Sequence, residues 1–161
     1  MATIAANVHS LLIPMANDTL LLPNAAVAEI IALTDIEPVE NAPEWLLGFI
    51  NWRGQHVPLL SFEVVNGNEK PEYQSKARIV VFNALGGSSS LPFFATLAQG
   101  IPHLIQANQS IVTALAESDE HPTGVLCPVL VEGEPAVIPD LDAMEKLILQ
   151  HPVLQEQLLS R

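Results

Sequence analysis

The sequence contains a single cysteine, Cys127, so no disulfide can form within the chain, and a reducing compartment suits it. The N-terminal stretch lacks the basic residues of a secretory signal and is interrupted by Pro14, Asn17 and Asp18. No apolar run approaches the roughly 20 residues that a membrane-spanning helix needs. These absences predict a cytoplasmic protein without direct membrane insertion.

Positive charge is also scarce. Lys and Arg number 6 against 18 Asp and Glu, which gives a formal net charge of -12 at pH 7. Proteins that bind nucleic acid neutralise phosphates with clustered Lys and Arg, and these residues do not cluster here. An anionic membrane surface would repel the chain for the same reason. We therefore expect partners that are proteins or small molecules, and no nucleic acid.

Catalytic and metal-binding motifs are missing as well. No two histidines have the spacing with which one element binds a metal, and no phosphate-binding glycine motif occurs. Cys127 and His121 are a conceivable nucleophile and base, but no oxyanion turn or third orienting residue accompanies them, so a buried structural cysteine is favoured. We expect no cofactor, no metal and no enzymatic activity. We expect structural or surface roles for the five histidines, His9, His56, His103, His121 and His151. We expect solvated loops at the acids Glu37, Glu40, Glu44, Glu117, Asp119 and Glu120.

Apolar residues and prolines are abundant. Hydrophobic residues make up 49% of the chain, and 13 prolines are spread along it. This combination predicts a packed domain of many short elements separated by turns, and it disfavours a helical bundle. Apolar runs on either side of turn residues predict hairpins. The expected hairpins are Val8–Met15 with Thr19–Leu22, Lys76–Leu85 with Leu91–Leu97, and Val125–Val131 with Pro135–Ile138, with an acidic loop at Glu117–Pro122.

Short helical stretches are expected between the strands. Residues Pro23–Ile31 have room for one or two helical turns with Asn24 as their cap, although they are too few for an independent helix. Pro43 predicts another single turn. The apolar run Val57–Val65 is predicted to be one strand that stops at Asn66.

Near the C-terminus the apolar period becomes that of a helix. Asp142 stands three residues before Glu145, as in a capping box, and Pro152 interrupts the pattern before a second short turn or helix. The apolar residues at this spacing are Leu141, Met144, Leu147, Ile148, Leu154 and Leu158. We expect one mostly β domain over residues 1–161 with a C-terminal helix and no internal repeat.

The segment Asn41–Phe62 contains an isolated cation. Arg53 is the only Lys or Arg before Lys70, and bulky apolar residues surround it in the sequence. An arginine in such a place must extend to solvent or pair with an acid, and Glu29 is the candidate partner. The alternative is an arginine that caps a loop or forms a surface pair worth ~0–1 kcal/mol.

Two stretches resemble the CheW-like family of chemotaxis adaptors. In AVAEII (Ala26–Ile31), Val27 and Glu29 match the family pattern V-x-E-(V/I). The second stretch, NAPEWLLGFINWRGQHVPLLSF, is similar to P-x-x-(hydrophobic)-x-G-(hydrophobic)-x-N-x-R-G-x-x-(V/I)-P-(V/I)-(hydrophobic)-D-(L/F). Its matching residues are Pro43, Gly48, Asn51, Arg53, Gly54, Val57 and Pro58.

The resemblance continues downstream and covers about residues 8 to 150. ARIVVFNAL and PFFATLAQGIPHLI resemble the second barrel of the family, and GEPAVIPDLDAMEKLI resembles its final strand and helix. Two places depart from the pattern. The family aspartate is Ser61 here, and the usual V-D-x-V is Ala98-Gln99-Gly100-Ile101. Ion pairs that those acids support in the family therefore cannot be carried over to this chain.

The resemblance implies two SH3-like five-stranded barrels with partly exchanged strands and a shared core. It implies a non-catalytic adaptor that couples methyl-accepting chemoreceptors to a CheA-type histidine kinase, in chemotaxis or, in ChpC-like relatives, in type IV pilus twitching motility. The kinase regulatory domain would pack against one barrel. The cytoplasmic tip of the receptor would lie in the groove between barrels, at membrane-associated arrays.

The same resemblance implies a set of binding residues. Glu29 and Arg53 would form a positioning pair near the receptor groove, and exposed apolar residues would supply contact, unless Trp52 belongs to the core. The set expected to bind receptor or kinase is Glu29, Arg53, Val27, Ile50, Asn51, Trp52 and Gly54, with Asn51 and Gly54 shaping the turn. A second hypothesis is a kinase-independent β-barrel module that binds a peptide or a small molecule through the same apolar surfaces.

Overall fold

Strands make up most of the regular structure in the part of the chain that the computed structural model describes, residues 8–73, 75–86, 90–115 and 122–159. The strands are β1 (Val8–Pro14), β2 (Thr19–Pro23), β3 (Val27–Ala32), β4 (Leu46–Trp52), β5 (Gln55–Leu60), β6 (Arg78–Asn83), β7 (Phe93–Ala98), β8 (His103–Ala107), β9 (Val112–Ala114), β10 (Val125–Val131) and β11 (Glu134–Pro139). The helical segments are a 3-10 turn η1 (Asn24–Ala26), α1 (Phe62–Val65), α2 (Leu141–Gln150) and α3 (Pro152–Leu159). The predicted mainly β fold is confirmed.

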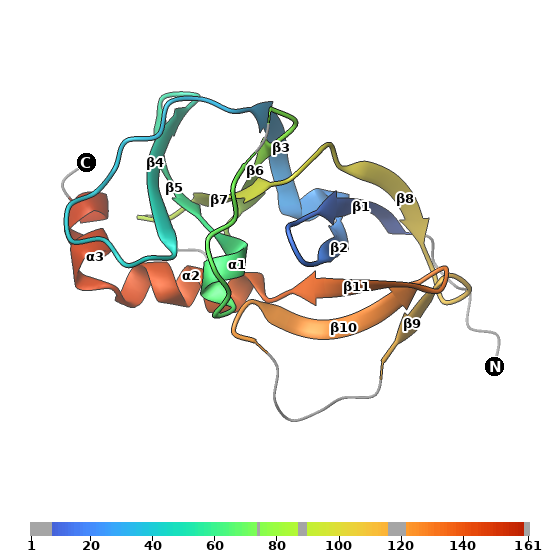
Figure 1. Cartoon of the computed structure of the whole chain (residues 1–161). Helices are drawn as coiled ribbons and strands as arrows, with labels where there is room; N and C mark the ends of the chain where they lie inside the picture. Colours follow the sequence, from blue (N-terminus) through green and yellow to red (C-terminus); the bar gives the residue numbers. More distant parts are fainter. Residues whose placement is uncertain (1–7, 74, 87–89, 116–121, 160–161) are drawn as a thin grey trace.

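The strands form two barrels that lie beside each other (Figure 1). The first barrel is the five-stranded sheet β3-β6-β7-β5-β4, and the second is the six-stranded sheet β8-β1-β2-β11-β10-β9. The hairpin nearest the N-terminus, β1–β2, therefore belongs to the barrel that the C-terminal strands build. The predicted exchange of strands is confirmed, and the short strand β9 makes the second sheet one strand larger than expected.

The two barrels are built alike, although no internal repeat is evident in the sequence. In each, a hairpin is followed by a helix: β4–β5 by α1, and β10–β11 by α2. Strand β5 runs parallel to β7, the second strand of the β6–β7 hairpin. In the same way, β11 runs parallel to β2, the second strand of the β1–β2 hairpin. The hairpins also contain a register shift at the same place, between Leu46 and Gly48 in one and between Val125 and Cys127 in the other.

Backbone contacts at the ends of the hairpins repeat in the same way. Ser61 donates its backbone N–H to the carbonyl of Trp45, and Asp140 donates to the carbonyl of Gly124, both at 2.8 Å. The two residues of each pair are the same number of positions apart, so the repeats align between these pairs without an insertion. Few side chains agree between the repeats, with Gly54 a rare identity, so the sequence alone showed no repeat.

A shared hydrophobic core lies between the barrels, as predicted. Adjacent residues of a strand point to opposite faces, so a strand between two cores is apolar on both. On β6, Val80 and Phe82 pack in the shared core, whereas Ile79 and Val81 pack inside the first barrel. The predicted apolar face of α2 also joins the shared core through Leu141, Met144 and Ile148, with Leu147 packed against it.

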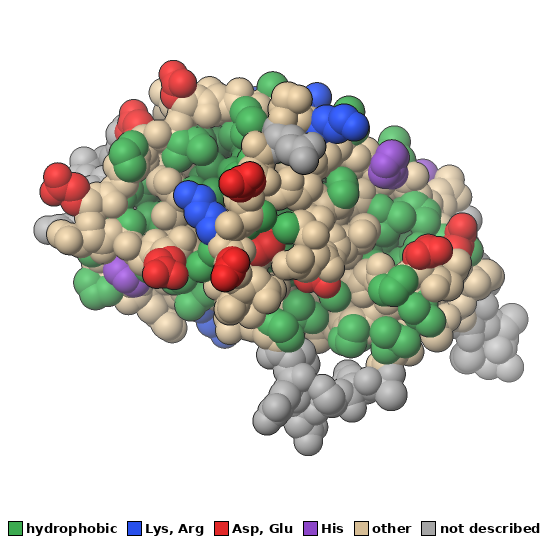
Figure 2. Space-filling view, in the orientation of Figure 1, with side chains coloured by type: hydrophobic (Ala, Val, Ile, Leu, Met, Phe, Trp, Pro, Cys, Tyr) green, Lys and Arg blue, Asp and Glu red, His purple; other side chains and the backbone are tan. Residues whose placement is uncertain are grey.

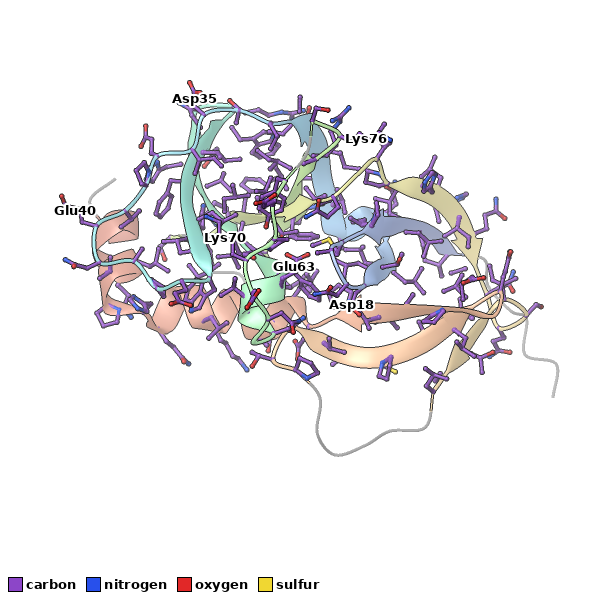
Figure 3. The ribbon with its side chains drawn as sticks, in the orientation of Figure 1. Asp18, Asp35, Glu40, Glu63, Lys70 and Lys76 are labelled. Carbon is purple, nitrogen blue, oxygen red and sulfur yellow. The ribbon has the colours of Figure 1, made fainter. Side chains whose placement is uncertain are left out.

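Two buried glutamates link each barrel to the hairpin that completes the other. Glu63 on α1 accepts a hydrogen bond from the N–H of Ala16 in the β1–β2 turn (2.9 Å), and it lies between the barrels in Figure 3. Glu145 on α2 accepts from the N–H groups of Leu85 and Gly86, just beyond β6 (2.8 Å each). Both side chains are only 2% exposed. Buried carboxylates with backbone donors fix the hairpins in place.

The hairpins, the turn at Pro43 and the C-terminal helix are confirmed, but three local predictions are wrong. Only Asn24–Ala26 is helical, and it is preceded by Pro23 without a side-chain cap, because the following β-branched residues pair with β6. The strand from Val57 ends at Leu60, where Ser61 caps α1. Asp140, and not Asp142, caps α2.

The acids of the 37–44 loop are exposed, as expected, and Glu40 lies at the rim of the molecule in Figure 3. The acids expected in the second loop, Glu117, Asp119 and Glu120, lie outside the described residues. None of the helices in the described ranges is long and apolar enough to cross a membrane.

The Glu145 contact predicts a stability difference between two acids of the same helix. Glu145→Ala would remove a buried carboxylate that accepts two backbone hydrogen bonds, so we expect the free energy of unfolding to fall by about 2–4 kcal/mol. Asp142→Ala, the control, removes only an exposed pair with Lys146 and should cost less than about 1 kcal/mol. Urea denaturation measures both, and equal losses would contradict the structural role of Glu145.

A glycine in β4 predicts a second difference. At Gly48, φ is 143° and an added Cβ would overlap the carbonyl oxygen of Glu37, whereas at Gly67 (φ 86°) nothing described lies within 4 Å. We expect Gly48→Ala to cost about 3 kcal/mol or more, because the strand must move, and Gly67→Ala about 1 kcal/mol from backbone strain alone. Thermal unfolding of the two variants checks the order, and a Gly48→Ala protein as stable as Gly67→Ala would refute it.

Candidate functional site

Arg53 lies in a strained two-residue turn. The turn joins β4 to β5, and its residues Arg53 and Gly54 have φ values of 52° and 76°, as in a type I′ hairpin. Such a turn favours Asn-Gly, and a left-handed arginine costs roughly 1–2 kcal/mol. As predicted, Asn51 shapes the turn, since its Oδ1 accepts a hydrogen bond from the N–H of Gly54 (3.2 Å). The equivalent turn of the second barrel has Glu132 at φ 50° before its glycine.

The predicted pairing of Arg53 with Glu29 is confirmed. Nη2 of Arg53 lies 2.9 Å from Oε1 of Glu29, and its Cζ lies 5.0 Å from the centroid of the Trp52 ring, a cation–π distance. The indole Nε1–H of Trp52 donates to the same Oε1 at 2.9 Å. One carboxylate oxygen thus orients both side chains. We call Glu29, Trp52 and Arg53 the Arg53 site.

The Arg53 site lies across the seam that closes the first barrel. Strands β3 and β4 are the two edges of the sheet, so Glu29 and Arg53 come from opposite edges. Beyond β3, Glu37 exchanges two backbone hydrogen bonds of 2.8 Å with Phe49, and Gly48 leaves room for this approach. Sheet closure therefore brings the two charges together, although they are far apart in sequence.

These contacts orient Arg53 but add little stability. The side chains of Arg53 and Glu29 are 69% and 38% exposed. Exposed ion pairs contribute about 0–1 kcal/mol, and exposed cation–π contacts about 0.5–1 kcal/mol. Their sum is comparable to the backbone strain of the left-handed arginine. The guanidinium is therefore presented to solvent in a defined orientation at almost no net gain in folding free energy.

Two predicted contact residues are buried, so that prediction is wrong. Ile50 is 1% exposed and Trp52 7%, and both point into the first barrel, where Trp52 meets the ring of Phe93 edge to face at 4.8 Å. Both faces of β4 are covered, because its other face packs in the shared core through Phe49. Val27 is half-buried against the shared core. Of the predicted apolar set, none is fully exposed.

Sequence reasoning missed the apolar side chains that do reach the surface. Leu104 on β8 is 78% exposed, and Ile101, just before β8, is also exposed. Leu33, which directly follows β3, is exposed as well. Figure 2 shows hydrophobic atoms spread over the second barrel, with few cations among them. The sequence gives no direct signal for Leu104, because the place of β8 at the edge of its sheet is known only from the strand order.

The structure shows how the chain is held at the two departures from the family pattern. Ser61 is buried, and its hydroxyl oxygen accepts a hydrogen bond from the N–H of Val64 (3.3 Å) at the start of α1. Serine and aspartate are about equally good helix caps, so the cap is preserved without the charge. Gln99, beside Gly100, donates its backbone N–H to the carbonyl of Pro14 (2.8 Å), a contact that needs no acid.

Other candidate chemistry is not assembled in the described residues. Cys127 is half-buried, and not fully buried as expected, with its thiol donating to the carbonyl of Pro128 (3.4 Å). His121, the other member of the proposed nucleophile pair, lies outside the described residues. No three described His, Cys, Asp or Glu gather as a metal site requires. Burial raises the pKa of Tyr73, and the nearby charge of Glu63 raises it too.

Comparison with known proteins places these features in a family. A profile of the CheW-like domain matches residues 9–147. Among solved structures, the crystal structure of the scaffolding protein TtCheW from Thermoanaerobacter tengcongensis is similar, with a TM-score of 0.70 and 16% sequence identity. The alignment covers 88% of this chain and 89% of that chain, and at this identity the likeness shows the fold. A comparison with curated protein sequences gives no match.

The geometry of the Arg53 site predicts opposite stability effects for neighbouring residues. Arg53→Ala should change the free energy of unfolding by less than about 1 kcal/mol, because its contacts are exposed. Trp52→Ala should lower the free energy of unfolding by about 3–5 kcal/mol, because it leaves a large cavity inside the first barrel. Urea denaturation at neutral pH separates the two, and a loss above 2 kcal/mol for Arg53→Ala, on the order of a buried contact, would show that Arg53 is structural.

Proposed function

Because this chain belongs to the CheW-like domain family, we propose that it is a non-catalytic adaptor coupling methyl-accepting chemoreceptors to a CheA-type histidine kinase. The observation that carries the proposal is the Arg53 site: a solvent-exposed guanidinium kept in a strained turn and oriented by Glu29 over the buried ring of Trp52. Glycine or asparagine would occupy this turn position at lower cost. Because Glu29 and Trp52 also orient the exposed guanidinium, we infer that Arg53 makes a contact outside the chain.

The chemistry of Arg53 suits the polar end of a helical receptor tip. A guanidinium has five N–H donors, and one terminal nitrogen contacts Glu29, so other donors face outward. They would bind a carboxylate or exposed carbonyl groups on the partner. Glu29 limits the motion of the side chain, which lowers the entropy lost on binding.

Apolar contact would come from residues that the structure exposes. A helix laid in a groove binds mainly through apolar side chains at regular spacing. Three exposed large apolar residues lie on or beside β3 and β8. Leu33 directly follows β3, Ile101 comes shortly before β8, and Leu104 is on β8. With half-buried Val27, they replace Ile50 and Trp52 as the proposed apolar contacts.

The kinase regulatory domain would pack barrel to barrel, a contact that requires no catalysis. The formal net charge of -12 favours partners that present neutral or basic surfaces to this chain. We propose recruitment from the cytoplasm to membrane-associated receptor arrays, with the output either chemotaxis or, as in ChpC-like relatives, twitching motility through type IV pili.

The receptor contact is tested by co-sedimentation of purified variants with a receptor cytoplasmic fragment and the regulatory domain of the kinase. We expect Arg53→Ala to weaken receptor binding at least tenfold, about 1.4 kcal/mol, while kinase binding stays near the unsubstituted level. Glu132→Ala is the matched control, because Glu132 occupies the equivalent left-handed turn position of the second barrel. It should bind both partners normally.

Three results would count against the proposal. Unchanged receptor binding by Arg53→Ala would remove the Arg53 site from the interface. Equal losses for Arg53→Ala and Glu132→Ala would indicate a general charge or folding effect. Binding of neither partner by the unsubstituted protein would favour the second hypothesis, a kinase-independent module for a peptide or a small molecule.

A further inference from the structure

The second barrel contains an apolar cavity that the adaptor function does not use. Its volume is about 490 Å³, and its walls come from β1, β2, β11 and the β8–β9 connection. Leu21, Ala107, Val112 and Ile138 line it and also form, or pack against, the interior cluster of this barrel. The cavity thus adjoins the core of the barrel and opens to solvent, with Val8 at its exposed edge.

The internal repeat shows that the interior of the second barrel is packed with smaller side chains. At the position where the first barrel has Trp52, the second has Val131, and Val57 is matched by Ala136. All four point into their barrels. The first barrel fills its interior further with the Trp52–Phe93 ring pair. The second barrel has the same strand arrangement with smaller side chains in its interior, and the cavity adjoins this interior cluster, where Leu21, Val112 and Ile138 line it.

The walls define the chemistry of the occupant. Among the described residues, no Lys, Arg, His, Asp or Glu lines the cavity, so an anionic or cationic ligand would leave its charge without a partner. The polar residues of the lining are Ser10, whose hydroxyl donates to the carbonyl of Val8 (3.0 Å), and Asn108 and Gln109. Cavities of roughly 300–1,000 Å³ with mainly apolar walls are typical of small-molecule sites.

We propose that the second barrel binds a small, uncharged, largely apolar molecule, of about two linked or fused rings in size. An apolar ligand in this cavity would remove apolar surface from water and gain dispersion contacts with the walls. The site is separate from the Arg53 site, because the two lie in different barrels. The proposal therefore stands or falls independently of the adaptor function.

A neutral fluorescent probe, N-phenyl-1-naphthylamine, tests the proposal. We expect saturable fluorescence enhancement on titration of the full chain, and a higher midpoint of thermal unfolding at saturation. Ala107→Phe, which fills the cavity, should lower the probe affinity at least tenfold. Ala32→Phe is the matched control: Ala32 ends β3 as Ala107 ends β8, and both strands pair with the first strand of a hairpin. It should bind like the unsubstituted protein.

The outcomes against the proposal are equally clear. No saturable binding by the unsubstituted chain would overturn it, and so would equal binding by Ala107→Phe. Val112→Phe serves as a second filling variant if Ala107→Phe does not unfold cooperatively. Sedimentation decides whether a second copy of the chain is the occupant instead. A dimer that excludes the probe and that Ala107→Phe dissociates would also overturn the proposal.

Discussion

The exchange of hairpins between the two barrels is the constraint on which the rest of the structure depends. Hairpin β1–β2 completes the barrel built by the C-terminal strands, and the strands between the hairpins complete the other. The second barrel cannot be completed without this N-terminal hairpin, and the chain between β2 and β8 forms the first barrel, so the packing of the two barrels is part of folding itself. Buried Glu63 and Glu145 reinforce this arrangement, because each holds a turn of a hairpin that belongs to the opposite barrel.

Closure of the first barrel positions the Arg53 site. Beyond the end of β3, Glu37 pairs with Phe49 of β4 through the backbone, and the hydrogen bond from Trp52 to Glu29 joins β4 to β3 through side chains. The arginine adds no appreciable stability to the seam, since it is exposed and its backbone is strained. A rigid scaffold thus presents one oriented cation on a strongly acidic protein. That is a suitable arrangement for recognition by a partner.

The two repeats share a backbone plan but differ in their side chains. Equivalent turns carry Arg53 in one and Glu132 in the other, and equivalent interior positions carry Trp52 and Val131. Each difference changes a property without changing the fold, because turn conformation and strand pairing depend mostly on backbone geometry and glycine. The first barrel has a cationic residue in this turn and a large aromatic side chain in its interior. The second barrel has an acidic residue in the turn and an apolar cavity beside its interior.

The sequence by itself determined the hairpins, the C-terminal helix and the pairing of Arg53 with Glu29. Turn residues, the spacing of apolar residues and an isolated cation can all be recognised from the local sequence. Only the tertiary structure decided that Trp52 and Ile50 are buried, that Val27–Ala32 is a strand, and that the barrels repeat. Local patterns show that a strand has apolar faces. Which face is covered, and by what, depends on strands that pack from other parts of the chain, as β6 and β7 cover Ile50 and Trp52.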